Sequence, residues 1–322
     1  MKKLISIGVP CYNEELNVIP AYIDLAKMAG KAKKYAFEFI FVDNGSLDDT
    51  RKKIIKIAKN DKRITGVFLS RNFGPEASPQ VALDYANGDA FILYECDAQD
   101  PVDLIPQFIK KWEDGDQVVV GMRTKIEDNV LMTSARKLFY KIFKKISNID
   151  IPVNAGSYGI IDKKVMFALK QLPEKYRFFR GLRSWVGFKS SSITYQRRER
   201  RRGISSYRFL DYIKHAERGF FGFSYLVLDG MVYLGFILVC FSFFFILCYI
   251  YVIFAFGNPI NASIPIIIAI FFFGGVQLLA VSILGKYIQV IMEETKARPV
   301  YIVDEIVARD HRKDRSERGR EK

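Results

Sequence analysis

One long stretch of this 322-residue chain carries no charged side chain. Asp, Glu, Lys, Arg and His are all absent between Asp229 and Lys286. A helix needs about 20 apolar residues to span a bilayer, so the stretch is long enough to cross one twice. Residues 257–261 interrupt it with Gly, Asn and Pro, which together have the composition of a turn. The pattern predicts a transmembrane hairpin at 226–291, with helices at about 226–256 and 263–290.

A buried helical hairpin in the core of a soluble protein is the alternative for this stretch. A helix of that kind would carry a polar stripe along one side. The run Phe241-Ser242-Phe243-Phe244-Phe245 has no such stripe, in a chain that is 50% hydrophobic and 14% aromatic. The membrane anchor is therefore the preferred interpretation.

The charged residues around the hairpin predict its orientation. The net charge is +14, and basic residues crowd at 197–202 before the hairpin and at 309–322 after it. The positive-inside rule places both flanks in the cytoplasm, and two crossings agree with that. The apolar run after Met1-Lys2-Lys3 is too short for a signal peptide. We expect a multi-pass protein of the cytoplasmic (inner or plasma) membrane, with its large N-terminal region and both termini in the cytoplasm.

The basic surplus has two interpretations. One is that the positive charge binds nucleic acid. An anionic membrane surface is the simpler one, because the basic residues lie next to the membrane segment. Residues 209–225 mix aromatic and basic side chains and predict an amphipathic interfacial helix, with packing on the soluble domain as its alternative. We therefore expect a membrane partner and no nucleic acid.

The region before the hairpin alternates short apolar runs with amphipathic segments. This alternation predicts an α/β domain with a mostly parallel sheet covered on both faces. We expect that domain at 1–208 and a cytoplasmic basic tail at 292–322. The predicted strands are 4–9, 37–42, 64–69, 90–95 and 117–120, and the predicted helices are 15–33, 48–60, 76–87 and 103–114.

Polar clusters follow three of the predicted strands, at residues 10–15, 43–46 and 95–100. The carboxyl ends of parallel strands share one edge of the sheet, where such folds bind their ligands. A turn after Glu95 would let Glu95 and Asp97 reach one cation, and carboxylate oxygens suit Mg²⁺ or Mn²⁺. A solvated acidic turn is the alternative. No glycine-rich phosphate loop is present, which argues against a nicotinamide enzyme or an ATPase.

Asp43 ends a buried strand, where its carboxylate can accept hydrogen bonds from a base or a ribose. A helix N-cap or an Asx turn is the alternative for this residue. Asp48 is better placed to begin the following helix, and we therefore expect Asp43 to be free for a ligand.

Four ordered motifs carry a family resemblance: Val9-Pro10-Cys11-Tyr12-Asn13-Glu14-Glu15, Val42-Asp43-Asn44-Gly45-Ser46-Leu47-Asp48, Leu69-Ser70-Arg71-Asn72-Phe73-Gly74 and Asp97-Ala98-Gln99-Asp100-Pro101. With them the chain resembles the family 2 GT-A glycosyltransferases. More narrowly it is similar to the polyprenyl-phosphate enzymes, of the dolichol-phosphate mannose synthase and bactoprenol glucosyltransferase (GtrB) types. Arg177-Phe178-Phe179-Arg180-Gly181-Leu182 and the paired membrane helices match the bactoprenol branch.

The resemblance implies inverting transfer of glucose or N-acetylglucosamine from a UDP-sugar to undecaprenyl (polyprenyl) phosphate. The implied product is a lipid-linked sugar for cell-envelope glycans, and the implied assembly is a tetramer. It implies Mg²⁺ or Mn²⁺ as cofactor. The implied nucleotide-binding residues are Pro10, Tyr12, Glu14, Asp43 and Glu95. The implied metal ligands are Glu95, Asp97 and Gln99. The implied acceptor-phosphate residues are Arg123, Arg136, Arg200, Arg202 and Ser205, and Asp97, Arg123, Arg136 and Arg200 are the implied catalytic residues.

The chain departs from the family pattern at four positions. Asn44 and Glu95 stand where the family usually has Asp, and Ser206 stands where it usually has Lys. Ser157 lies where many relatives read Gly-Asp-Phe-Arg, and it cannot act as a carboxylate base. A lipid phosphate is already an anion at neutral pH, so we expect direct in-line displacement that relies on positioning and charge neutralisation.

Two other functions remain open. A processive family 2 polysaccharide synthase would have a Gln-x-x-Arg-Trp signature and more membrane helices, whereas Trp185 lies in Arg183-Ser184-Trp185 without the Gln. A membrane scaffold that keeps the fold without activity is the other, and the departures at Asn44, Glu95 and Ser157 would suit it.

Overall fold

The computed structural model describes residues 2–124, 155–175, 177–198, 226–256, 263–296 and 298–308. The strands are β1 (Leu4–Cys11), β2 (Ala36–Asp43), β3 (Ile64–Leu69), β4 (Ala90–Leu93), β5 (Val118–Arg123), β6 (Ala155–Asp162), β7 (Ser190–Tyr195) and β8 (Val303–Ala308). The helices are α1 (Val18–Lys31), α2 (Thr50–Asn60), α3 (Ala77–Tyr85), the 3₁₀ turn η1 (Val102–Leu104), α4 (Ile105–Glu113), α6 (Lys163–Gln171), α7 (Phe179–Trp185), α9 (Leu226–Phe256) and α10 (Ser263–Thr295).

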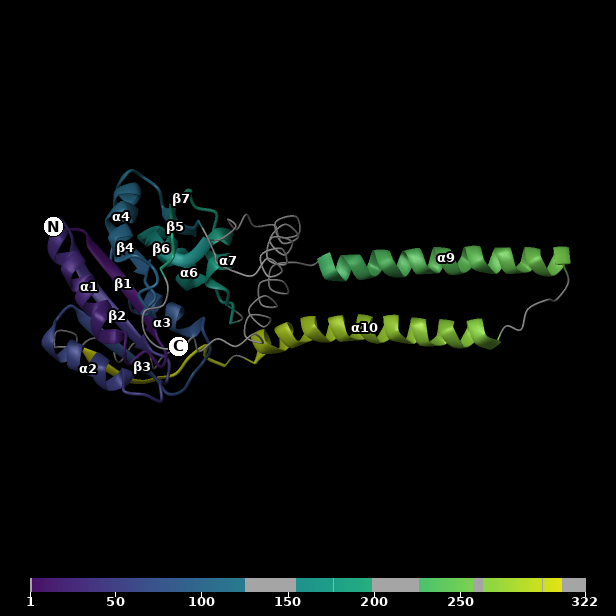
Figure 1. The fold of residues 1–322 in the computed structure, drawn as a ribbon, viewed down its shortest axis with the longest axis horizontal. Coiled ribbons are helices and arrows are strands. Elements are labelled where there is room, and N and C mark those ends of the chain that lie inside the picture. The colour runs from purple at the N-terminus through teal and green to yellow at the C-terminus, as the bar shows by residue number, and fades with distance from the viewer. Residues whose placement is uncertain are drawn as a thin grey trace.

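The strands form one sheet in the order β7-β5-β6-β4-β1-β2-β3-β8 (Figure 1). Strands β1, β2, β3 and β4 are parallel neighbours, and β5 pairs in parallel with β7. Strands β6 and β8 run antiparallel to their neighbours. The register pairs Cys11 with Asp43, so the loops after β1 and β2 leave the sheet side by side. The predicted α/β fold with a mostly parallel sheet is confirmed.

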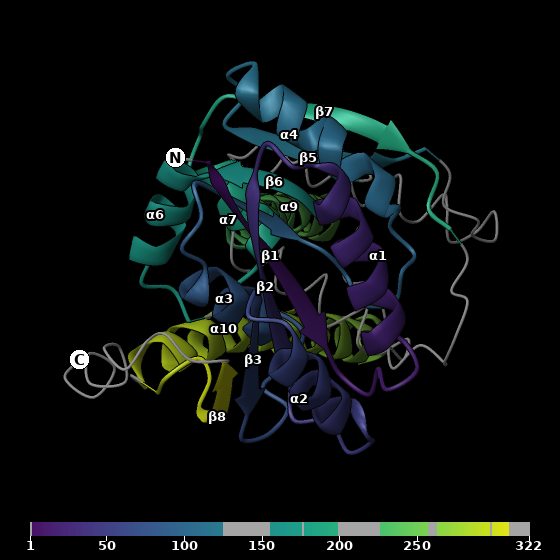
Figure 2. The same ribbon diagram turned by 90° about the vertical axis from the view of Figure 1, so that its left-hand side faces the viewer.

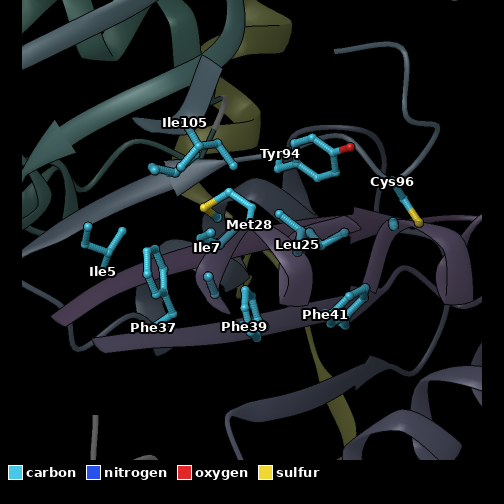
Figure 3. Packing of buried hydrophobic residues seen from close by; sticks show 14 of the residues in the cluster. Ile5, Ile7, Leu25, Met28, Phe37, Phe39, Phe41, Tyr94, Cys96 and Ile105 are labelled. Carbon is cyan, nitrogen blue, oxygen red and sulfur yellow. The ribbon is translucent and has the colours of Figure 1, made fainter. Parts of the chain in front are cut away.

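Alternating side chains of β2 supply two separate cores, because successive side chains in a strand point to opposite faces. Phe37, Phe39 and Phe41 pack on the face covered by α1, α2 and α4 (Figure 3). Ile40 and Val42 pack on the opposite face, under α3, α6 and α7. Figure 2 shows the same division, with α1 and α3 on either side of the sheet. Full burial of each such side chain stabilises the fold by about 1.5–3 kcal/mol.

The sequence predicts five of these strands and misses three. Strand β8 lies within the segment expected as a basic tail, and it joins the sheet beside β3. Arg51 binds Asp304 at 2.7 Å and Glu305 at 2.6 Å, and the Tyr301 hydroxyl donates to Asp84 at 2.9 Å. The chain that follows α10 therefore returns to the edge of the α/β domain, while residues 309–322 lie outside the described part.

Two long helices extend from this domain and run antiparallel to each other (Figure 1). Their bounds agree with the two helices predicted from the uncharged stretch. Large apolar side chains are exposed on both, for example Phe254 at 88% and Leu278 at 71%. Within the described residues, Phe272–Thr295 of α10 is the segment long and apolar enough to cross a membrane. The expected turn at 257–261 and the interfacial helix at 209–225 lie outside the described residues.

Candidate functional site

The loops after β1 and β2 are joined by hydrogen bonds between them. The backbone N–H of Asn13 donates to Ser46 Oγ at 2.9 Å, and the N–H of Leu47 donates back to Asn13 Oδ1 at 2.9 Å. The N–H of Glu14 donates to Thr50 Oγ1 at 2.8 Å. Asn13 has a φ of 53°, a left-handed conformation that Asn tolerates better than most residues. Two of the three predicted polar clusters are thus fixed to each other.

Asp43 is buried at the end of β2, 2% exposed. Its Oδ1 accepts the Ser46 backbone N–H at 3.1 Å and the Ser46 hydroxyl at 2.5 Å. This is the Asx turn, so the expectation that Asp43 is free of a local turn is wrong for one of its two oxygens. Burial is the main cause that raises the pKa of Asp43. Asp48 accepts the N–H of Thr50 at 3.0 Å, just before α2 begins.

The other residues expected at the nucleotide lie around the same loops. Pro10, Tyr12 and Glu14 are partly buried, and the Glu14 carboxylate accepts Asn17 Nδ2 at 2.6 Å. They stand at the carboxyl end of β1, next to Asp43 across the β1–β2 pairing. The structure therefore brings these four residues to one place, and their contact with a base or ribose stays a prediction.

Asn44 has a structural reason to differ from the family's usual Asp. Its amide Nδ2 donates to the Gly74 carbonyl at 2.8 Å and to Asn72 Oδ1 at 3.3 Å. Its Oδ1 accepts the Phe73 N–H at 3.0 Å. An ionised Asp can only accept, so it could not replace the two donated bonds. Asn44 ties the loop after β3 to the loop after β2.

Glu95 and Asp97 both face one cationic group, the guanidinium of Arg197. Arg197 Nη2 lies 3.0 Å from Glu95 Oε2 and 3.7 Å from Asp97 Oδ2. The chain turns at residues 96–97, between and at the two acidic positions, and Ala98 next to them has a φ of 56°. Asp97 Oδ1 accepts the Gln99 N–H at 3.1 Å, which holds this turn. In this structure the cation that both carboxylates approach is an arginine, and their binding of one divalent cation stays a prediction.

Asp100 lies at the centre of a charge cluster that the sequence analysis does not predict. It is 1% exposed and accepts the Tyr195 hydroxyl at 2.5 Å. Arg123 and Arg197 approach it at 3.9 and 3.8 Å. Burial and the negative charge of Glu95 raise the pKa of Asp100. Burial lowers the pKa of Arg123, but the charges of Asp100 and Glu95 outweigh that effect and raise it.

A second group of arginines surrounds the start of β6. Arg180 Nε donates to Ser157 Oγ at 3.1 Å, and Arg183 Nη2 donates to the Gly156 carbonyl at 2.9 Å. A side chain at Gly156 would lie 3.5 Å from the Arg123 guanidinium, so three arginines border these two residues. Arg183 is buried, and burial together with the charge of Arg180 lowers its pKa to about 9.

The structure thus brings together Pro10, Tyr12, Glu14, Asp43, Glu95, Asp97, Gln99 and Arg123 at one edge of the sheet. Arg136, Arg200, Arg202, Ser205 and Ser206 lie outside the described residues. Sequence reasoning missed Asp100, Tyr195, Arg180 and Arg183. Asp100 and the two arginines stand in or beside quoted motifs and could have been found there. No signal in the sequence marks Tyr195.

The donor set can be tested against a divalent cation. Among the described residues no group of three His, Cys, Asp or Glu side chains is placed to hold a metal. Mg²⁺ and similar ions are commonly held by one or two carboxylates and completed by substrate phosphates and water. Glu95 and Asp97 already converge on a positive charge, and their side chains are 31% and 12% exposed. This pair fits a metal that arrives with a phosphate.

Comparison with known proteins gives consistent matches over most of the chain. A family model described as Glycosyl transferase family 2 matches residues 6–167. An uncharacterized glycosyltransferase of Synechocystis is 35% identical over 303 residues, which cover 94% of this chain and 95% of that protein. Bactoprenol glucosyl transferase of Shigella phage SfV is 35% identical, over 93% of this chain and 97% of that protein. A prophage bactoprenol glucosyl transferase homolog of Escherichia coli K12 is 33% identical, over 94% of this chain and 99% of that protein.

Proposed function

The chain belongs to glycosyl transferase family 2, and from that premise we propose that it transfers a hexose from a UDP-sugar to a polyprenyl phosphate. The observation that carries the proposal is the position of Glu95 and Asp97, between two hydrogen-bonded polar loops and a cluster of arginines. The donor diphosphate and the acceptor phosphate are both anions, and each needs positive charge near it. The two phosphate groups lie on opposite sides of the bond that breaks. The relatives named bactoprenol glucosyl transferase support glucose and undecaprenyl phosphate as the pair.

On the donor side, the uridine binds along the loops after β1 and β2. Pro10 and Tyr12 offer apolar surface for the base, and Glu14 and Asp43 offer carboxylate oxygens for its polar edge and the ribose. The hydrogen bonds between Asn13, Ser46 and Leu47 support this assignment, because a pocket fixed before binding loses less conformational entropy when the donor arrives.

The diphosphate then lies over Glu95, Asp97 and Gln99. A bound Mg²⁺ or Mn²⁺ would supply a positive charge that stabilises the departing nucleoside diphosphate. Asp97 would be its principal ligand, because Asp97 Oδ1 is oriented by the Gln99 N–H in a turn that leaves the residue partly exposed. Glu95 reaches the same position over one additional methylene.

On the acceptor side, the lipid phosphate binds the arginines. Arg123 is held by Asp100 and Tyr195, so its guanidinium is already oriented. Arg136, Arg200, Arg202 and Ser205 complete this site in the proposal. Planar guanidinium groups match two phosphate oxygens at once, which orients the attacking oxygen as well as binding it.

The missing carboxylate at Ser157 is compatible with this chemistry. The attacking oxygen of a phosphate is already deprotonated at neutral pH, so in-line displacement with inversion requires no general base. The residues of the chain hold the two substrates in line and balance their charge, which is where most of the rate enhancement of such a transfer would arise.

The two long helices provide the anchor in this proposal. Helices α9 and α10 cross the membrane as a hairpin, with the domain 1–208 and the termini on the cytoplasmic side, and the segment 209–225 lies on the membrane surface. The exposed apolar side chains of both helices support it, since they need a non-aqueous environment. The lipid acceptor then presents its phosphate close to the arginines. A tetramer remains the expected assembly.

The test is incubation of the purified full chain in detergent with labelled UDP-glucose or UDP-N-acetylglucosamine and undecaprenyl phosphate, with and without EDTA. The expected product is a labelled lipid that forms with one donor and is lost in EDTA. If no lipid-linked sugar forms from any donor, the remaining hypothesis is that the chain is an inactive membrane scaffold. A water-insoluble polymer would instead identify a processive synthase.

A further inference from the structure

Arg197 occupies the position between the two carboxylates that the proposed metal would need. Its Nη2 lies within 4 Å of both Glu95 and Asp97, and its Nε lies 3.8 Å from Asp100. That Nε is buried and donates no hydrogen bond within the described part of the chain. Three acidic side chains therefore share one guanidinium. Of the three contacts, the one with Glu95 is short enough to be a hydrogen bond.

The backbone next to Arg197 shows that this placement is built into the fold. The N–H of Arg198 donates to the Gln99 carbonyl at 2.9 Å, and Gln99 Nε2 donates to the Arg198 carbonyl at 3.3 Å. The segment that follows β7 is thus fastened to the turn that carries Asp97. Arg197 is brought over the acidic pair by these two hydrogen bonds, and its side chain is only 28% exposed.

We propose that Arg197 is the resident counter-ion of the acidic pair and competes with the divalent cation for it. The guanidinium neutralises Glu95 and Asp97 while no donor is bound, and it must withdraw before a metal can bind both. Arg197 is therefore a positioning residue that sets the affinity for the metal. This inference rests on the metal assignment of the proposed function.

Charge balance supports competition over joint binding. Glu95, Asp97 and Asp100 carry up to three negative charges, and Arg123 already offsets part of the charge of Asp100. Adding a divalent cation while Arg197 remains would place like charges within about 4 Å of each other, an arrangement that is unfavourable in a partly buried site. The extra methylene of Glu95 suits this arrangement, because it lengthens the reach of the carboxylate toward Arg197.

The experiment measures Mn²⁺ binding to the full chain in detergent by electron paramagnetic resonance, with UDP and without sugar or lipid. Arg197→Gln should bind Mn²⁺ about fivefold more tightly than the unchanged chain, the size expected from losing a partly exposed ion-pair network. Arg197→Lys keeps the charge without the planar fork and should fall in between. The matched control is Arg198→Gln, since the Arg198 side chain pairs with the exposed Asp103 among the described residues, and the Mn²⁺ affinity of this variant should be unchanged.

Equal or weaker Mn²⁺ binding in Arg197→Gln, with unfolding temperature preserved, would overturn the inference. So would sugar transfer that persists in EDTA by a chain that binds no Mn²⁺ in either form. The readout is independent of the lipid acceptor. Tighter binding in Arg197→Gln by a chain that transfers no sugar would therefore refute the proposed function and leave the competition standing.

Discussion

The two sides of the candidate site are held by different kinds of interaction. Around the loops after β1, β2 and β3, neutral hydrogen bonds between short side chains and backbone join the loops into one unit. Around β5, β6 and β7, arginines are held by carboxylates and carbonyl groups. Changes to the residues that join these loops should therefore act mainly on folding, whereas changes to the charged residues on the second side should act mainly on binding.

The largest effect is expected where the two sides meet, at Asp97. Asp97→Ala removes a proposed metal ligand and should lower the rate of sugar transfer about 10²- to 10³-fold, the usual loss when a group that stabilises developing charge is removed. The measurement is initial-rate formation of lipid-linked sugar. Asp103→Ala is the matched control, because Asp103 is in the same segment and its side chain is 80% exposed. Unchanged activity in Asp97→Ala would contradict the metal assignment.

For the joined loops after β1, β2 and β3, the strongest test of stability is at Gly45. Its φ is +70°, and a Cβ there would lie 2.5 Å from the backbone carbonyl carbon of Arg71. Gly45→Ala should therefore cost about 3 kcal/mol, from left-handed strain and a backbone clash together. That corresponds to a fall of roughly 6–12 °C in the unfolding temperature of the domain.

Gly115 separates the two causes. Its φ is +100°, but a Cβ there meets nothing within 4 Å. Gly115→Ala should therefore cost about 1–2 kcal/mol of strain alone. Equal losses at Gly45 and Gly115 would show that the contact between the loops after β2 and β3 does not matter to stability.

Asn44 gives a third test on the folding side, and here structure and family pattern disagree. Asn44→Asp restores the family's usual residue, yet it removes the donors to Gly74 and Asn72 and places a carboxylate against their oxygens. The expected cost is about 1–3 kcal/mol, measured as a lower unfolding temperature. Asn60→Asp, at the exposed end of α2, should change it little. A more stable and more active Asn44→Asp would favour the family pattern.

The same contrast explains what the sequence predicts and what it does not. The five predicted strands and the convergence of Glu95 with Asp97 follow from apolar periodicity and strand ends, which are local patterns. Strand β8 pairs with β3 from more than 230 residues away in the chain, and no local pattern records that. Arg197 was one residue of a basic run, and only the Arg198–Gln99 backbone pairing reveals its acidic partners. Asp43 looked free because its Asx turn depends on Ser46 rather than on a helix start.

The smallest effect is expected on the binding side, at Ser157. Ser157→Asp would place a carboxylate beside Arg180, whose Nε now donates to the hydroxyl at 3.1 Å. If Arg180 joins Arg123 in binding the lipid phosphate, the new pair would draw it away from that phosphate. KM for undecaprenyl phosphate should then rise about threefold with little change in kcat, the size expected of a partly exposed ion pair. Ser157→Ala, which removes the hydroxyl without adding charge, should leave KM near its original value.

Stability should move the other way in Ser157→Asp, and this makes the comparison decisive. Arg180 and Arg183 contact neighbouring residues, Ser157 and Gly156, so two like charges lie close together. Burial and then the charge of Arg180 lower the pKa of Arg183. A carboxylate at position 157 would offset that repulsion and raise or preserve the unfolding temperature. An unchanged KM in Ser157→Asp would mean that Arg180 takes no part in binding the acceptor. A lower unfolding temperature would mean that this side of the site, like the other, is held by neutral contacts rather than by charge.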